Sequence, residues 1–248
     1  SSQHTNDQNA KFNIEKEKYV DIVCDLSDAS SCHGIFDGCD IVIHLAGDGN
    51  PKANFISSLV PNNIVSVYNV CIEAKRANVK RIIFASSNHT QVYGFEQMNA
   101  ATEGFAGKIC HPEKLINMEN SSSCPTSLYG VSKIAGEAIG QFYSVREKAF
   151  EFIALRIGWV VYNNANVHKG TPLNDYLQSM YLSKEDCIGF FVAAAEAILE
   201  EKNSFFVGYA VSNNETRIYD LTETCKILKY TPVDGNGCTS FPTNNKTD

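Results

Sequence analysis

Three continuous apolar runs, each about the length of a β-strand, constrain the fold of this chain more than any other feature. They read DIVIHLAGD (40–48), KRIIFASSN (80–88) and EFIALRIGW (151–159). Runs of this kind are typical of strands that are buried on both faces of a sheet. Segments with helical periodicity, 62–78 and 127–148, fall between them. This alternation predicts right-handed βαβ units and a largely parallel sheet in an α/β protein.

A shorter apolar segment comes before these runs. We expect a strand in YVDIVCDLSD (19–28) that ends at Asp25, followed by a short crossover helix over 29–36. The prediction is therefore one sheet with four adjacent parallel strands, which are 20–24, 41–46, 81–86 and 152–157.

The pattern continues after the third run. A helix over 183–201 is indicated by Ser183 and Asp186, which have the spacing of a capping box ahead of an apolar stripe. A strand over 204–212 and a short helix over 219–228 follow. These segments extend the α/β pattern toward the end of the chain.

The domain organisation predicted from the sequence is simple. Residues 1–18 are polar and indicate a flexible arm, 19–235 form one domain, and 236–248 form a flexible tail. The irregular stretch 94–126 is too long for an ordinary connection, so we expect a functional loop or an insertion. The chain begins at Ser1 and not at Met, which suggests a processed, trimmed or incomplete chain.

Composition narrows the classes of partner. The formal net charge of −7 on 248 residues argues against nucleic acid or an anionic membrane as the main partner. No continuous apolar run approaches the ~18–20 residues that cross a bilayer. The nine cysteines are odd in number and contain no C-x-x-C pair. We therefore expect no disulfide framework and no metal site, and a reducing, cytoplasmic location.

The carboxyl ends of parallel strands meet at one edge of the sheet, where ligands bind. This rule selects the strand ends Asp25, Ala46–Gly47, Ser86–His89 and Ile157–Trp159. A helix that follows the long loop carries Tyr129 and Lys133, which are four residues apart and so lie on one face. An isolated Y-x-x-x-K is a weak signal, and the strand ends give it its context.

Four short motifs in this order resemble a known family. They are DL at 25–26, HLAG at 44–47, ASSNH at 85–89 and YGVSK at 129–133. The series resembles the extended short-chain dehydrogenase/reductase superfamily, also called the NAD-dependent epimerase/dehydratase family. FASSNHT, LYGVSK and LRIG make it most similar to the uronate dehydrogenases within that family. The resemblance runs from about residue 19 to residue 235 and implies a Rossmann-like, doubly wound parallel sheet with a small C-terminal substrate-side region.

The resemblance implies catalytic roles for three residues. Tyr129 would be the general base that takes a hydroxyl proton while hydride passes to nicotinamide. Lys133 would favour the phenolate, lower the pKa of Tyr129 and hydrogen-bond the nicotinamide ribose. Ser87 would orient the reacting oxygen, and Asn88 and His89 would contact the substrate.

The resemblance also implies NAD as the cofactor. Asp25 and Leu26 match the pair that meets the adenine. Asn63 matches an asparagine at the start of a helix that contacts the cofactor, with an ordinary N-cap as an equally open interpretation. The remaining cofactor-binding positions are the strand end Leu45, Ala46 and Gly47, the residue Ile157 beside the nicotinamide, and Lys133.

The sequence departs from the family in two places. It contains no G-x-x-G-x-x-G turn, so the first βαβ unit that holds the pyrophosphate is missing from the printed residues. On the substrate side, Trp159 replaces a serine, and DGNP (48–51) replaces a short serine-bearing turn. His168 and Tyr176 fall near the position of the arginine that pairs with the uronate carboxylate.

Three functions stay open from the sequence. The first is an NAD-dependent oxidoreductase of carbohydrate metabolism that acts on a sugar or sugar acid, with uronate oxidation at C1 to the lactone as the finer prediction. As given, such a chain should be weakly active or inactive. The alternatives are a non-catalytic scaffold with the same fold and a nucleotide-sugar epimerase. The resemblance also implies a homodimer that pairs through the Tyr129 helix and the helix before it.

Overall fold

The computed structural model describes residues 20–91, 123, 125, 127–160, 177–199, 204–214 and 217–235. A parallel sheet of four strands forms its centre, in the order β1-β2-β3-β6. The strands are β1 (Ile41–His44), β2 (Arg81–Ser87), β3 (Glu151–Ile157) and β6 (Phe205–Ala210). Three of the four predicted strands are thereby confirmed as adjacent and parallel.

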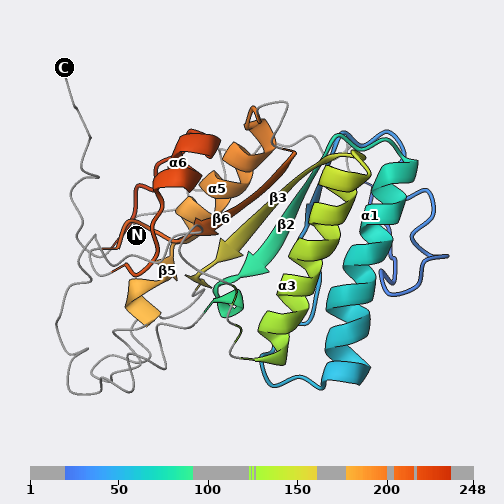
Figure 1. The fold of residues 1–248 in the computed structure, drawn as a ribbon, viewed down its shortest axis with the longest axis horizontal. Helices are drawn as coiled ribbons and strands as arrows, with labels where there is room; N and C mark the ends of the chain where they lie inside the picture. Colours follow the sequence, from blue (N-terminus) through green and yellow to red (C-terminus); the bar gives the residue numbers. More distant parts are fainter. Residues whose placement is uncertain are drawn as a thin grey trace, which may run out of the picture.

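Helices cover both faces of this sheet (Figure 1). One face carries a π-type helical stretch η2 (Phe55–Val65), then α1 (Ser66–Arg76), α3 (Leu128–Gln141) and a π-type turn η5 (Phe142–Arg146). The other face carries α5 (Lys184–Glu196) and α6 (Thr222–Leu228). Two short elements follow central strands, η3 (Asn88–Thr90) after β2 and β4 (Trp159–Val160) after β3. Strand β4 pairs in parallel with β5 (Tyr181–Leu182) in a separate two-stranded sheet. This is the expected α/β, doubly wound arrangement.

Alternation along the strands divides the core into two layers. Ile82, Phe84 and Phe152 face α1 and α3, whereas Ile83 and Ile153 face α5. All five side chains are fully buried. The apolar runs are continuous because both faces of the central strands are covered.

Helix α3 lies unusually close to the sheet because it presents two glycines to it. A Cβ at Gly136 would lie 2.7 Å from the ring of Phe84, and one at Gly140 would lie 2.3 Å from Phe152. Ordinary side chains at these positions would push the helix outward. The close approach places the N-terminal turn of α3 directly over the end of β2.

The helix predicted over 62–78 begins earlier in the structure. The side chain of Asn54 accepts a hydrogen bond from Ser57 N at 2.9 Å and caps η2, which runs directly into α1. Pro61 argues against a helix in the sequence, but it is accommodated within the wider π-type turns. The combined stretch Phe55–Arg76 is long and apolar enough to cross a bilayer by length and composition alone. It packs against α3, as the core helix of a globular protein does, and is weak evidence for a membrane span.

The N-cap that the spacing of Ser183 and Asp186 predicted is confirmed, although the reciprocal bond of a capping box is replaced by one from Ser183 N to Ser212 Oγ at 2.9 Å. Ser183 Oγ accepts the backbone N–H of Asp186 at 3.0 Å, and α5 begins at the next residue, Lys184. The helix ends at Glu196 rather than at 201, because Ala197 takes an extended conformation with ψ of 142°.

The expected strand over 20–24 is wrong, and so is the helix over 29–36. Residues 20–25 are irregular, and 28–39 form successive turns joined by i→i+3 hydrogen bonds. Val20 and Val23 are 84% and 103% exposed. The physical reason is that a strand needs a partner, and no strand within the described part of the chain pairs with this segment or with the outer edge of β1.

Side chains of α1 hold the irregular segment in place instead. Asn69 Nδ2 donates to the carbonyl of Leu26 at 2.9 Å, and the Glu73 carboxylate accepts from Gly34 N at 2.6 Å. We expected β1 to be buried on both faces, but Ile41 and Ile43 are 39% and 48% exposed. Strand β1 lies at the edge of the sheet and has no described partner on its outer side. The predicted arm 1–18, the tail 236–248 and most of the 94–126 loop lie outside the described residues, so the domain limits stay a prediction.

Candidate active site

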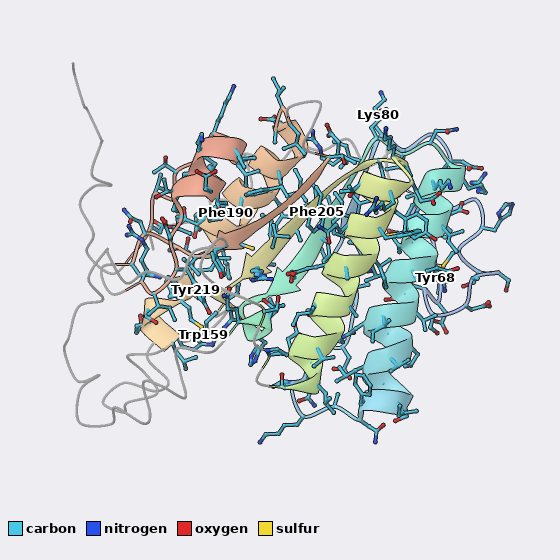
Figure 2. All side chains as sticks on the ribbon, viewed as in Figure 1. Tyr68, Lys80, Trp159, Phe190, Phe205 and Tyr219 are labelled. Atoms are coloured by element: carbon cyan, nitrogen blue, oxygen red, sulfur yellow. The ribbon has the colours of Figure 1, made fainter. Side chains whose placement is uncertain are left out.

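The candidate site lies at the carboxyl ends of the parallel strands. Figure 2 shows Lys80, which precedes β2, and Trp159, which follows β3, at opposite ends of the sheet. Ser87 is the last residue of β2, and its hydroxyl accepts the backbone N–H of His89 at 3.1 Å. This bond caps the short η3 turn, so the strand ends in a fixed position.

The N-terminus of α3 is pressed onto that turn. Ser127 caps the helix by accepting Gly130 N at 3.1 Å. A Cβ on Gly130 would lie 2.2 Å from the carbonyl oxygen of His89, so only glycine allows this contact. The contact brings Tyr129, on the first turn of α3, next to Ser87.

Ser87, Tyr129 and Lys133 come together as predicted. The Ser87 side chain lies near enough to the phenol of Tyr129 to favour the phenolate and lower the pKa of Tyr129. Lys133 Nζ lies 5.7 Å from the centroid of the Tyr129 ring and donates to the carbonyl of Ala85 at 2.8 Å. Three side chains from two elements therefore surround one position at the edge of the sheet.

The electrostatics of the pair differ from expectation. Burial raises the pKa of Tyr129, the nearby Ser87 side chain lowers it, and the carboxylate of Asp48 raises it further, so that the net direction is upward. The expected lowering by Lys133 is therefore wrong for the chain by itself. Burial also lowers the pKa of Lys133 to about 8, against the opposing charge of Glu137.

The end of β1 has the shape expected of a cofactor edge. Leu45, Ala46 and Gly47 are exposed. Gly47 has a φ of +148°, and a Cβ there would lie 2.9 Å from Asn63 Oδ1 and 3.7 Å from Lys133 Nζ. The backbone thus passes beside Lys133 with no side chain in the way, and the residues of the nicotinamide side fit a bound dinucleotide.

Asn63 fixes this edge to α3 and is not an N-cap. It is buried inside η2, where its Oδ1 accepts Asp48 N at 2.6 Å. Its Nδ2 donates to Asp48 O at 3.0 Å and to Ser132 Oγ at 2.9 Å. The N-cap interpretation is therefore wrong, and Asn63 ties the loop after β1 to the helix that carries Lys133.

The positions predicted to meet the adenine are less well formed. The exposed carboxylate of Asp25 accepts the backbone N–H and the hydroxyl of Ser27 at 2.9 and 2.7 Å. Leu26 packs against the core. Both lie in the irregular segment rather than at a strand end. Ile157, in contrast, lies beside Ser87 in register on β3 and is half-buried.

Asn88 and His89 differ in how available they are. Asn88 is buried, with its Nδ2 donating to the Met180 sulfur at 2.8 Å and its Oδ1 accepting from Ser87 at 3.3 Å. His89 packs edge-on against Tyr129 at 5.5 Å, and its buried Nδ1 has no partner among the described residues. His89 therefore offers a free polar atom beside the phenol. His168 and Tyr176 lie outside the described residues.

Four buried polar residues close to the site were missed from the sequence: His44, Gln91, Glu137 and Arg156. His44 stacks on Phe84 at 5.7 Å, and burial lowers its pKa to about 4. Glu137 follows Lys133 by one helical turn, and Arg156 is a charged residue within an otherwise apolar strand. Both positions are unusual enough in the sequence to have indicated a buried polar pair.

A cavity of about 920 Å³ opens at the opposite end of the sheet, lined by residues that include Asp40, Lys80, Arg81 and Glu151. These four residues form two ion pairs, Lys80 with Asp40 and Arg81 with Glu151. Because ligands of parallel sheets bind at the carboxyl ends of the strands, this cavity is not the candidate site.

Comparison with known proteins identifies the family. Residues 3–172 match the model of the NAD dependent epimerase/dehydratase family. The chain belongs to this family.

Two curated proteins are among those to which this family member is similar. L-arabinose 1-dehydrogenase (NAD(P)(+)) of Haloferax volcanii is 32% identical over 230 residues, which cover 90% of this chain and 85% of the relative. Uronate dehydrogenase of Pseudomonas syringae pv. tomato is 30% identical over 214 residues, covering 86% of this chain and 66% of the relative. The chain thus spans about two thirds of that uronate dehydrogenase.

A solved structure agrees with the fold. A mutated uronate dehydrogenase superposes with a TM-score of 0.66 at 27% identity, covering 86% of this chain and 66% of that one. The epimerase/dehydratase-family chain therefore has the Rossmann-like α/β fold that the sequence predicted.

Proposed function

We propose that this chain carries the catalytic residues of an NAD-dependent oxidoreductase that oxidises a sugar or sugar acid at C1. The observation that carries the proposal is the convergence of Ser87, Tyr129 and Lys133 at the end of β2, where Lys133 Nζ lies 5.7 Å from the centroid of the Tyr129 ring. The names of the relatives, an arabinose and a uronate dehydrogenase, support the substrate class. The finer proposal is uronate oxidation at C1 to the lactone.

Each residue has a defined task in this proposal. NAD, when bound, supplies the hydride acceptor. Tyr129 takes the proton of the C1 hydroxyl, and Ser87 holds the reacting oxygen by donating to it. With NAD bound, the charge of Lys133 and that of the nicotinamide would together favour the phenolate. Lys133, the exposed edge Leu45–Gly47 and Ile157 would hold the nicotinamide side of the cofactor. Asp25 and Leu26 are the proposed adenine contacts.

The substrate contacts proposed are Asn88 and His89. The unpartnered Nδ1 of His89 next to Tyr129 supports a hydrogen bond to a sugar hydroxyl. The proposed location is the cytoplasm, and the free thiols of the described cysteines, among them buried Cys71, are consistent with it.

A homodimer is the proposed assembly. Tyr68 and Ile72 on α1 are 47% and 41% exposed, and Phe142 and Val145 at the end of the α3 side are 51% and 46% exposed. Figure 2 labels Tyr68 on the side of α1 away from α5 and α6. Analytical sedimentation tests this assembly. The unaltered chain should sediment as a dimer and the Tyr68→Glu variant as a monomer. If the unaltered chain is itself a monomer, the proposed dimer is contradicted.

Turnover of a chain extended ahead of Ser1 with a strand, a glycine turn and a helix tests the function, because the printed residues contain no glycine turn for the pyrophosphate. The purified extended chain is mixed with NAD and either L-arabinose or a hexuronate, and the appearance of NADH is followed by its absorbance. Tyr129→Phe should remove any activity, because the ring stays and the proton acceptor is lost. Tyr68→Phe, on exposed α1, is the matched control and should leave the rate unchanged. Activity that survives in Tyr129→Phe would contradict the proposed base.

A further inference from the structure

A buried polar cluster lies directly behind the candidate active site and joins five parts of the fold. Its members lie on β2, after η3, and on α3, β3 and β6, and none is more than 6% exposed. They are Ser86, Gln91, Glu137, Arg156 and Tyr209. Ser86, Arg156 and Tyr209 are register partners on three neighbouring strands, so they point to the same face, toward α3.

An ion pair between Arg156 and Glu137 forms the centre of this cluster. Arg156 Nε donates to Glu137 Oε1 at 2.9 Å, and Nη2 donates to Oε2 at 2.7 Å. Ser86 Oγ donates to the same carboxylate at 2.5 Å. The guanidinium also donates from Nη1 to Gln91 Oε1 at 3.0 Å, and the hydroxyl of Tyr209 donates to that oxygen as well. The parallel fork fixes the geometry of the pair.

Each end of the cluster is one step from a residue of the site. Ser86 precedes Ser87 on β2. Gln91 follows the η3 turn, and its backbone N–H donates to Asn88 O at 2.9 Å. Glu137 follows Lys133 by four residues on α3, one helical turn further. Displacement of the pair would therefore move the strand end, the turn and the helix together.

Stability alone does not account for a buried ion pair at this place. Removing two charges from water costs about as much as their attraction returns, so apolar residues of similar size stabilise a core at least as well. What the pair adds is a single defined arrangement, because a half-satisfied network is strongly disfavoured. The three elements that it aligns are the three that surround Tyr129.

We propose that the Arg156–Glu137 pair, with Ser86 and Gln91, is a positioning device that aligns Ser87, the η3 turn and Lys133 around Tyr129. The inference rests on the proposed function, since it concerns the presentation of the proposed base. Glu137 and Arg156 are positioning residues in this role, acting through Ser87 and Lys133.

The device has an electrostatic consequence at Lys133. The titratable groups near this ammonium are Tyr129 and Glu137 on α3, His44 on β1, and Asp48 in the loop after β1, whose neighbour Gly47 approaches Lys133 Nζ. Among these, Glu137 keeps Lys133 protonated against burial. Removing the charge of Glu137 should therefore make Lys133 lose its proton at lower pH.

The test is an NMR titration of the chain itself and requires no turnover. The ¹³Cε signal of Lys133, assigned by its loss in Lys133→Arg, should titrate near pH 8 in the unaltered chain. Glu137→Gln should lower that midpoint by about 1 pH unit. The ¹³Cζ signal of Tyr129 should titrate at higher pH in the same variant, because a displaced Ser87 no longer lowers the pKa of the phenol.

A matched control exists at the other end of the same two strands. Glu151 pairs with Arg81, which is 8% exposed, through a bond of 2.8 Å from Arg81 Nε, and the two are register partners on β3 and β2. Glu151→Gln breaks another Arg–Glu ion pair, here between two strands and with a more exposed glutamate, far from Tyr129. It should leave both titration midpoints unchanged.

Ser86→Ala keeps the experiment decisive if Glu137→Gln does not fold. This change removes only the hydroxyl that joins Glu137 to the strand end, and it should raise the Tyr129 midpoint as well. If Tyr129 titrates as in the unaltered chain in every folded variant of the cluster, the inference is wrong. Because the midpoints do not depend on turnover, they can move even if no sugar is oxidised, which separates failure of this inference from failure of the proposed function.

Discussion

Tyr129 lies between one neighbour that favours its phenolate and two influences that oppose it. Burial and the charge of Asp48 raise its pKa, whereas the nearby Ser87 side chain lowers it. Asp48 keeps its own charge at neutral pH, because bonds from the Ser58 hydroxyl and Asn50 N hold its pKa below the usual value. The loop DGNP (48–51) thus brings a carboxylate close to the proposed base.

Asp48→Asn should lower the pKa of Tyr129, because a like charge no longer opposes the phenolate. The side-chain oxygen of asparagine can still accept from Ser58, so the loop should keep its shape. The ¹³Cζ titration of Tyr129 measures the change. Asp28→Asn, an exposed carboxylate that holds only its own turn, serves as the control, and an equal effect in both variants would rule out a local action of Asp48.

His44 gives the chain a sensitivity to acid. Its folded pKa is about 4, below the ordinary 6.5, so the unfolded chain binds a proton first as the pH falls. The resulting stability is fully present above about pH 6.5 and is lost toward pH 4. The loss between about pH 7 and about pH 5 should be about 2 kcal/mol. Urea unfolding at the two pH values measures it.

His44→Leu should remove that loss, because no proton is then taken up on unfolding. Exposed His33, with a side-chain exposure of 73%, provides the comparison. His33→Gln should keep the full acid sensitivity of the unaltered chain. A His44→Leu chain that loses stability as steeply as the unaltered one would assign the effect to other groups.

Among the elements, α5 shows how a helix N-terminus can anchor a distant segment. The carboxylate of Asp186 is fully buried on its first turn. It accepts four hydrogen bonds, from the Tyr230 and Ser212 hydroxyls at 2.8 and 2.6 Å and from Val233 N and Asp234 N at 2.7 and 3.1 Å. This carboxylate therefore attaches the segment 230–235 to α5, together with a bond of 2.7 Å from the N-cap Ser183 Oγ to Asp234 Oδ2 and the contact between the rings of Phe190 and Tyr230.

Asp186→Asn should destabilise the chain by about 2–4 kcal/mol, because an amide NH₂ would face donors that the carboxylate accepts. Hydrogen exchange at Val233 and Asp234 should rise well above that in the unaltered chain. The neighbouring exposed Glu185→Gln should change neither property. Unchanged exchange at Val233 in Asp186→Asn would show that other contacts hold the segment.

In the whole molecule, the residues proposed to hold the nicotinamide side of NAD lie on a sheet whose β1 edge has no partner strand among the described residues. The printed sequence has no glycine turn for the pyrophosphate. Each charge-assisted bond lost there is worth roughly 1.5–3 kcal/mol. Losing two or three weakens binding by about three orders of magnitude or more. The chain should accordingly bind NAD weakly and turn over slowly or not at all.

Calorimetric titration of the 248-residue chain with NAD measures this deficit directly. The matched comparison is a chain extended with a strand, a glycine turn and a helix ahead of Ser1, which should recover affinity and turnover. Micromolar binding by the unextended chain would mean that another part of the sequence supplies the phosphate site.

How much of the fold the sequence predicts depends on how far apart in the chain the interacting residues lie. The central strands β2 and β3 were predictable because both faces are apolar. The cap at Ser183 was predictable because its partner is three residues away. The segment 20–24 was misjudged because a strand depends on a neighbour that its own residues do not encode.

The residues of the candidate site also differ in how far along the chain their partners lie. Tyr129 and Lys133 share one helix, so their spacing alone placed them together. Asn63, Glu137 and Arg156 have partners far along the chain, and no spacing rule predicts the bonds of Arg156 to a helix and to Gln91 at once. The sequence motifs therefore identified the residues that line the site but not the buried Glu137 and Arg156 behind it.

The one-sided burial of β1 also determines how this chain behaves in concentrated solution. Ile41, Ile43 and Leu45 are 39%, 48% and 61% exposed along a strand whose outer edge no described strand covers. A flat apolar edge of this kind is a template on which strands from other molecules add, and it leads toward insoluble β-rich aggregates. Ile43→Lys would place a charge at the middle of the edge, the same device that natural edge strands use to remain in solution.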